Sequence, residues 1–413
     1  MEVPQGKGGT WLYFRPWYRK SPYFEETQKA GCRSYELYNH MYLPGFYTSF
    51  EDEYWHLINH VALWDVAVER CVEITGPDAH RFTNMITCRD LNRCAVGQAK
   101  YAPIIAADGG ILNDPVLLRL GEDHYWLALA DSDGVLYCKG VAACAGMDVE
   151  IGEAEAYPVQ VQGPKSPEVM RALFGAETID AIRYYWTAQT DLDGIPVVIS
   201  RTGWTAELGY EIYLRDASKG SELWNRILEA GAPFEIRPTG PSDVRRMEAG
   251  IFNWGPDFNW RHNPFEVTGL ERLVEPQDED YLGKEVLERV RREGVRRKLV
   301  GVEIGEERMP EEMEEFWPVR SAGSEVGYVT NAVWSPRLER NIGYAWVPIE
   351  LSAEGTPLEV AWPFGDAAKA TVALLPFLDH NKDIPAGRAE VPDRDHATAA
   401  GTAVRPDGGT GRS

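Results

Sequence analysis

The sequence predicts an α+β fold in which antiparallel sheets carry short helices and a separate β-barrel domain follows toward the C-terminal end. Two observations support this fold class. Between residues 46 and 297, alternating apolar strands are separated by short helical stretches, which is typical of α+β layers and not of a doubly wound parallel sheet. From residue 298 the helical pattern fades, and short strands follow one another at even spacing, as in small barrels and sandwiches.

Composition narrows the class of function. The 413 residues, 44% of them apolar, are enough for two or three domains with cores of their own. The net charge of −22 argues against nucleic acid, which requires basic surface. No apolar run reaches the roughly 18 residues of a membrane span, the N-terminus lacks a signal-peptide pattern, and six scattered cysteines without CxxC fit reduced thiols. We therefore expect a cytoplasmic enzyme acting on a small molecule, with a homo-oligomer possible.

The first half of the chain divides into elements in a clear order. Residues 1–45 are aromatic and irregular, which suggests an arm laid over the body. The elements expected next are a helix feeding a strand (51–66), an alternating strand (68–76), a helix beginning near its proline (77–87), three strands joined by DGG and GED turns (99–131), and a helix (133–146).

The second half contains the barrel strands. The elements expected are strand 157–163, a helix ended by Gly175, strands 196–204 and 210–214, helix 217–231, and barrel strands 298–304, 325–333, 341–347, 358–362 and 371–375. Residues 384–413 are poor in large apolar residues, which predicts a disordered tail. The domains expected are therefore the arm (1–45), an α+β region of two interleaved subdomains (46–297), the barrel (298–383) and the tail.

Common cofactor and catalytic motifs are missing from the sequence. No G-x-G-x-x-G follows a strand, GKGGT at 6–10 lacks the P-loop spacing, and no G-x-S-x-G elbow occurs. His56 and His60 stand four residues apart on an expected helix, but a zinc site needs three or four ligands and no third ligand is near in the sequence. We expect no metal site.

Four segments together carry a resemblance to a known family. They are DGGILNDPVLL (108–118), RTGWTAELGYEIYL (201–214), DVRRMEAGIFNWGPDF (243–258) and VTNAVWSPRLERNIGYAWV (329–347). Their order and spacing resemble the aminomethyltransferase superfamily, the glycine-cleavage T-protein fold. Within it, stretches such as LWDVAVER (63–70) and YPVQVQGPKS (157–166) are most similar to the dimethylsulfoniopropionate demethylases. The resemblance implies a multi-domain fold around a central cavity that binds tetrahydrofolate.

The resemblance also gives a role to an acid inside a strand. Glu211 sits between Tyr210 and Ile212 in an alternating strand, where an acid would by itself be assigned to the solvent face. In the superfamily the glutamate of this strand grips the pterin, whose neighbouring amide and amine a carboxylate can accept as a bidentate pair. The other positions implied for the cofactor are Tyr101, Trp204, Tyr213 and Arg246, and those implied for the substrate are Trp186, Trp204 and Ala128. Arg246 could instead form a structural ion pair with Glu248 or another acid.

Some residues depart from the family pattern. T-proteins read G-G-x-x-D-D where this chain reads GGILNDP, so their first acid is Asn113 here. An amide cannot take up a proton at neutral pH, which disfavours aminomethyl transfer and suits simple methyl transfer. We expect Asn113, Asp114 and Tyr213 to be catalytic, with Asp114 holding a proton from the folate or capping the turn. Ala128 replaces a serine of the demethylases, which leaves the donor open.

The hypothesis is therefore a tetrahydrofolate-dependent demethylase acting on dimethylsulfoniopropionate. The alternatives are the same transfer from a betaine, N-methyl or O-methyl donor, or the aminomethyltransferase of glycine cleavage. The basic stretch LERVRREGVRRKL (287–299) is expected to be an exposed helix, either simply solvated or a dock for the anionic tail of a polyglutamylated folate.

Overall fold

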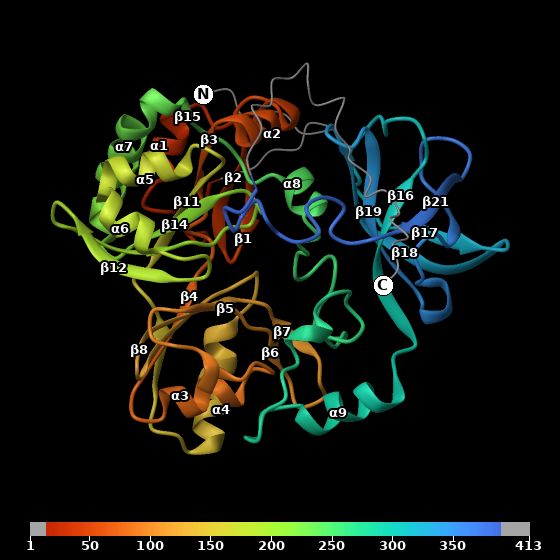
Figure 1. Cartoon of the computed structure of the whole chain (residues 1–413), viewed down its shortest axis with the longest axis horizontal. Helices are drawn as coiled ribbons and strands as arrows, with labels where there is room; N and C mark the ends of the chain where they lie inside the picture. Colours follow the sequence, from red (N-terminus) through yellow and green to blue (C-terminus); the bar gives the residue numbers. More distant parts are fainter. Residues whose placement is uncertain (1–13, 390–413) are drawn as a thin grey trace, which may run out of the picture.

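The structure, a computed structural model, describes residues 14–389, and its strands form three main units (Figure 1). They are a six-stranded sheet, a five-stranded sheet and a closed barrel. All pairings in these units are antiparallel except that of β15 with β3. The α+β fold with a C-terminal barrel is confirmed.

The bounds of the strands follow the order in which neighbours pair. The six-stranded sheet contains β12 (Thr187–Leu192), β13 (Ile195–Ser200), β14 (Gly209–Leu214), β11 (Tyr157–Gln162), β3 (Val61–Asp65) and β15 (Ile236–Pro238). The five-stranded sheet contains β10 (Glu150–Glu153), β4 (Cys71–Thr75), β9 (His124–Ala128), β8 (Val116–Gly121) and β5 (Ala99–Tyr101). The barrel contains β16 (Arg297–Ile304), β19 (Arg340–Pro348), β18 (Ser324–Ser335), β17 (Trp317–Ser321), β20 (Pro357–Val360) and β21 (Ala368–Ala373).

Two hairpins and the helices complete the fold. The hairpins are β1 (Ser34–Tyr38) with β2 (Met41–Phe46), and β6 (Ile104–Ile105) with β7 (Ile111–Asn113). The helices are α1 (Phe24–Lys29), α2 (Phe50–Asn59), α3 (Ala79–Met85), α4 (Gly134–Ala145), α5 (Ser166–Phe174), α6 (Ala176–Ala181), α7 (Gly220–Gly231), α8 (Asp243–Glu248) and α9 (Lys284–Glu293).

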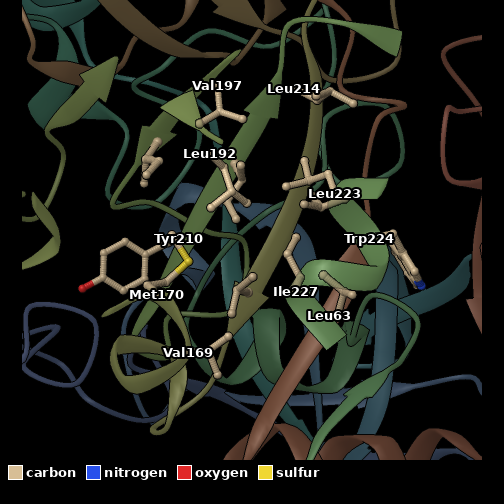
Figure 2. Packing of buried hydrophobic residues seen from close by; sticks show 14 of the residues in the cluster. Leu63, Val169, Met170, Leu192, Val197, Tyr210, Leu214, Leu223, Trp224 and Ile227 are labelled. Carbon is tan, nitrogen blue, oxygen red and sulfur yellow. The ribbon is translucent and has the colours of Figure 1, made fainter. Parts of the chain in front are cut away.

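The six-stranded sheet has two faces of different chemistry. Successive side chains of a strand point to opposite faces, so the residues of β14 divide into two sets. Tyr210, Ile212 and Leu214 belong to the apolar core that α5 and α7 cover, shown in Figure 2. Glu211 and Tyr213 therefore lie on the opposite face, toward the middle of the molecule. The alternation of β14 decides which face the acid occupies.

The segment 99–131 contains five short strands where three are expected. The DGG and GED turns join β6 to β7 and β8 to β9, in agreement with the sequence. Two prolines account for the difference, because Pro103 and Pro115 have no backbone N–H to donate to a sheet. Each proline separates two of the strands, and the segment therefore changes direction beside the site described below.

The N-terminal segment is more regular than its composition suggests. Within the described part of the arm, residues 14–45 contain α1, β1 and most of β2. The disordered tail expected at 384–413 lies, from residue 390 onward, outside the described residues. The basic stretch 287–299 is helical only as far as Glu293, because α9 ends at Gly294 and the rest enters β16.

Helix α8 joins the sheet to the barrel, and in Figure 1 it lies between them. Tyr344 in β19 donates its hydroxyl to the carbonyl of Met247 at 3.1 Å. Ser335 in β18 and Tyr54 in α2 both donate to Oε1 of Glu248, at 2.6 and 2.7 Å. One short helix thus anchors three parts of the chain that are distant in sequence.

Three broader observations bear on the sequence analysis. All six cysteines are free thiols, as expected. In the region covered by the structure, no helix is both long and apolar enough to cross a membrane. His56 and His60 stack at 5.0 Å, and among the described residues no group of three metal-ligating side chains occurs.

Candidate active site

A cavity of about 1310 Å³ lies where the two sheets, the hairpin β1–β2 and the barrel meet. Its size is sufficient for a pteridine together with a small second substrate, since pockets for drug-sized ligands usually measure about 300–1,000 Å³. Aromatic and acidic side chains share its wall. Those used below are Tyr38, Glu69, Tyr101, Asp114, Ala128, Gln160, Tyr184, Tyr185, Trp204 and Glu211.

Glu211 lines this cavity and is only 3% exposed. Its Oε1 accepts a hydrogen bond from Nε2 of Gln160 at 2.7 Å. Its Oε2 accepts one from the Tyr213 hydroxyl at 2.9 Å and a shorter one from the Thr202 hydroxyl. Burial raises the pKa of Glu211, and these three donors oppose the rise. No Arg or Lys of the described chain forms an ion pair with this carboxylate.

The three hydrogen bonds change the expected bidentate contact. Each carboxylate oxygen has two lone-pair sites, and both sites of Oε2 are already taken by Thr202 and Tyr213. Only Oε1 of Glu211 has an acceptor site left for a ligand. Beside it, Gln160 is fully buried and its Oε1 has no hydrogen-bond partner in the described structure. Oε1 of Glu211 and Oε1 of Gln160 are therefore the acceptor atoms still available here, and their contact with the cofactor stays a prediction.

Gln160 also connects Glu211 with a second acid. The two residues are direct cross-strand partners on β11 and β14, which places their side chains on the same face. Nε2 of Gln160 lies 3.5 Å from Oε1 of Glu69, which lines the cavity as well. Burial raises the pKa of Glu69 well above its ordinary value, and the negative charge of Glu211 adds to the effect.

Asp114 is another acid that lines the cavity. It follows β7, and its Oδ2 accepts a hydrogen bond of 2.7 Å from the hydroxyl of Tyr101 at the end of β5. Burial raises the pKa of Asp114 to about 7, while the bond from Tyr101 opposes the rise. A carboxyl group with a pKa near neutrality can both accept and release a proton at the working pH.

Asn113 performs a different task from its neighbour. Its Nδ2 donates to the carbonyl of Ala130 at 3.0 Å and to Oγ of Ser132 at 2.8 Å, and its Oδ1 accepts from the N–H of Ala130 at 3.1 Å. The amide thus holds the loop after β9, and it does not line the cavity. A catalytic role for Asn113 stays a prediction.

The structure brings some predicted site residues together and places others elsewhere. Tyr101, Asp114, Ala128, Trp204 and Glu211 all line the cavity. Tyr184 and Tyr185 line the cavity, whereas Trp186 packs at the edge of the core with the guanidinium of Arg183 over its ring, so a substrate contact for Trp186 stays a prediction. Tyr213 is fully buried and reaches the site only through its bond to Glu211.

Arg246 is placed by ion pairs. Its guanidinium lies 2.7 Å from Oδ1 of Asp243 and 2.7 Å from Oδ2 of Asp257, and it is fully buried. Arg246 does not line the cavity, although it packs over Trp204, which does. The alternative of a structural ion pair is therefore present, with Asp257 as the buried partner instead of Glu248. Contact between Arg246 and the cofactor stays a prediction.

Sequence reasoning missed Glu69 and Gln160. A signal for Gln160 exists, because Gln160 and Gln162 alternate with Val159 and Val161 in β11, and two polar residues on one face of a central strand need partners. Glu69 falls within the alternating strand expected at 68–76, but β4 begins only at Cys71 and Glu69 lies in a bend, so strand alternation does not set the direction of its side chain. The basic stretch 287–299 contributes no residue to the cavity wall.

Comparisons with known proteins identify the family. Residues 23–278 match the GCVT N-terminal domain, and residues 297–379 match the glycine cleavage T-protein C-terminal barrel domain. The chain therefore belongs to the glycine-cleavage T-protein (GcvT) superfamily, and it is an enzyme of the methyltransferase class. The resemblance inferred from the sequence motifs is confirmed.

Individual relatives refine this placement. The chain is 38% identical to the dimethylsulfoniopropionate demethylase DmdA of Ruegeria pomeroyi over 347 residues, which cover 84% of this chain and 94% of that protein. It is 31% identical to an aminomethyltransferase of Symbiobacterium thermophilum over 370 residues, 87% of this chain and 97% of that protein. The aminomethyltransferase T structure from Bartonella henselae shares the fold, with a TM-score of 0.77, 22% identity and coverage of 87% and 98%.

Proposed function

We propose that this protein is a tetrahydrofolate-dependent demethylase that transfers a methyl group from dimethylsulfoniopropionate to N5 of tetrahydrofolate. The products are 5-methyltetrahydrofolate and methylmercaptopropionate. The observation that carries the proposal is the 38% identity, over 84% of this chain, to the dimethylsulfoniopropionate demethylase of Ruegeria pomeroyi. We retain the expectation that the enzyme works in the cytoplasm.

The cavity wall supports tetrahydrofolate as the acceptor. The edge of a pterin presents an amide N–H beside an exocyclic amine, so it needs two neighbouring hydrogen-bond acceptors. Oε1 of Glu211 and the unpaired Oε1 of Gln160 supply such a pair on the inner face of the six-stranded sheet. A buried acceptor without a partner is costly, and a ligand that donates to it removes this cost.

Methyl transfer from a sulfonium needs no acid for the leaving group, and it needs one base, which Asp114 can provide. When bound, tetrahydrofolate supplies the N5 lone pair that attacks the methyl carbon. The carbon–sulfur bond breaks, and sulfur keeps the electron pair and leaves as a neutral thioether, so no residue has to protonate it. The N5 proton must then be removed, and the carboxylate of Asp114, positioned by Tyr101, would accept it. The walls need only align the reactants and exclude water.

Asn113 argues against aminomethyl transfer. In the T-protein pattern an acid stands at this position, whereas here the amide donates to Ala130 and Ser132. A carboxylate cannot donate either bond, so the position is shaped for an amide. This contact supports the demethylase over the aminomethyltransferase.

The proposal is tested by incubating the purified protein with tetrahydrofolate and dimethylsulfoniopropionate and analysing the folate by mass spectrometry. We expect 5-methyltetrahydrofolate and an equal amount of methylmercaptopropionate, with neither product when the donor is omitted. A parallel panel contains glycine betaine, an N-methylated amine and a methoxy-aromatic acid. Methylated folate only from a member of that panel would replace dimethylsulfoniopropionate as the donor. Absence of methylated folate from every donor would refute the proposal.

A further inference from the structure

Glu69 is a cavity carboxylate that the proposed reaction has not used. Its only side-chain hydrogen bond within the described structure is the 3.5 Å contact from the amide of Gln160. No cation of the described residues pairs with it, although its neighbour in sequence, Arg70, pairs with Glu153 at 2.6 Å. An ionised carboxylate removed from bulk water without a counter-ion is strongly unfavourable.

The neighbourhood of Glu69 increases this cost. Gln160 stands between Glu69 and Glu211 and donates to both, so two acids share a single amide group. Like charges at short range disfavour ionisation of both.

We propose that Glu69 is the specificity-determining residue that recognises the positive charge of the methyl donor, so that the bound cation serves as its missing counter-ion. The inference rests on the proposed methyl transfer and adds to it the residue that selects the donor by its positive charge. A sulfonium or quaternary ammonium cation has no N–H to donate, so it is recognised by an anion and by aromatic faces and not by hydrogen bonds.

The surrounding wall offers such aromatic faces. Tyr38 lines the same cavity. Burial is the largest cause that raises the pKa of its hydroxyl, and the negative charges of Asp114 and Glu69 are the next largest, so both acids lie near this hydroxyl. Tyr185 lines the cavity near Glu211, whose charge acts on it in the same way. Tyr38 and Tyr185 thus line the same cavity as Glu69, and a cation bound there would have both a carboxylate and aromatic side chains available.

The chemistry of the transfer gives Glu69 a distinct kinetic signature. The donor loses its positive charge as the methyl group leaves, so Glu69 stabilises the bound donor more than the transition state. Removing the negative charge should therefore weaken donor binding without lowering the rate of the bound complex. A residue needed only for folding would instead lower kcat and ligand binding together.

The test uses the full chain with Glu69→Gln. The two ligands are dimethylsulfoniopropionate and 4-methylpentanoate, which has the same shape but a neutral carbon in place of the sulfonium. Isothermal titration calorimetry measures both affinities without tetrahydrofolate, so that no methyl transfer takes place during the titration. We expect the variant to bind dimethylsulfoniopropionate, which carries the sulfonium charge, roughly 10–100-fold more weakly, and to bind 4-methylpentanoate, which carries only the carboxylate, as well as or better than wild type. Its KM for the donor should rise while kcat holds or increases.

The matched control is Glu73→Gln. The Glu73 carboxylate is hydrogen-bonded to the side chains of Trp126 and His124 and does not line the cavity. This control should retain the wild-type preference for the cation. An equal loss of both ligands in Glu69→Gln, an unchanged preference for the cation, or a loss confined to tetrahydrofolate would overturn the inference. If wild type binds the cation through Glu69 but forms no methylated folate, the proposed function fails and the inference stands. If methyl transfer proceeds and Glu69→Gln keeps the preference, only the inference fails.

Discussion

Buried charges occur in two regions of this molecule. In one region they form ion pairs, and in the other the carboxylates have no positively charged partner among the described residues. Around α8, Arg245 lies 2.7 Å from Glu207 and Arg246 lies 2.7 Å from Asp257, with all four side chains almost fully buried. In the cavity, the buried or partly buried carboxylates of Glu69, Asp114 and Glu211 receive hydrogen bonds only from neutral groups in the described structure.

The difference separates structural charges from functional ones. A buried charge that has a counter-ion can hold segments together, and removal of one partner leaves the other as an uncompensated buried charge. A buried carboxylate without a counter-ion has a raised pKa and reduces stability, which is the usual state of groups that act on a ligand. The region around α8 therefore joins the domains, and we propose that the cavity acids act on the substrates.

The largest effect on stability is expected from breaking the buried ion pair between Arg246 and Asp257 at α8. Asp257→Asn leaves the buried guanidinium of Arg246 with only the partly exposed Asp243, so the free energy of unfolding should fall by about 3 kcal/mol. Denaturant unfolding measures the loss. Asp243→Asn is the matched control, because this acid bonds the same arginine but is 58% exposed, and its change should stay below about 1 kcal/mol. Equal losses in the two variants would contradict the comparison.

Asp114→Asn should raise the free energy of unfolding, and the size of this gain should depend on pH. The folded protein holds the Asp114 proton up to a pKa of about 7, whereas the unfolded chain releases it near 4, so wild type loses stability as pH rises through that window. The variant lacks this loss. Its gain over wild type should be near zero at pH 4 and grow to at most about 4 kcal/mol above pH 7. A stability difference that is constant between pH 4 and 8 would show that Asp114 is not destabilised by burial.

The smallest effect on stability is expected at Glu211. Glu211→Gln removes a buried charge without a counter-ion, and the amide can keep part of the hydrogen bonding, so the unfolding free energy should change by less than about 1 kcal/mol. Tetrahydrofolate affinity should fall roughly 10–100-fold, because a hydrogen bond to a charged group is lost. Fluorescence titration with the folate measures this. Full folate affinity in the variant would remove Glu211 from the binding site.

The sequence predicted most of the fold and part of the site. Alternation in β14 and the motifs around it indicated Glu211, and the barrel strands followed from their even spacing. Pro103 and Pro115 were visible, but their division of one segment into several strands was not anticipated. The sequence could not show which of the aromatic residues 184–186 line the cavity, because neighbouring side chains differ in the direction that the local backbone gives them, and Tyr185 has a positive φ of 61°.

By itself, the sequence determined which residues alternate along a strand, and hence that Glu211 and Gln160 occupy inner positions once their outer neighbours are covered by helices. Local spacing carries this information because side chains of a strand alternate with a period of two. Only the tertiary structure decided that Glu69 comes within reach of Gln160 and lacks a cation, whereas Arg246 meets Asp257. Counter-ions are chosen by the packing of distant segments, and no spacing along the chain specifies that choice.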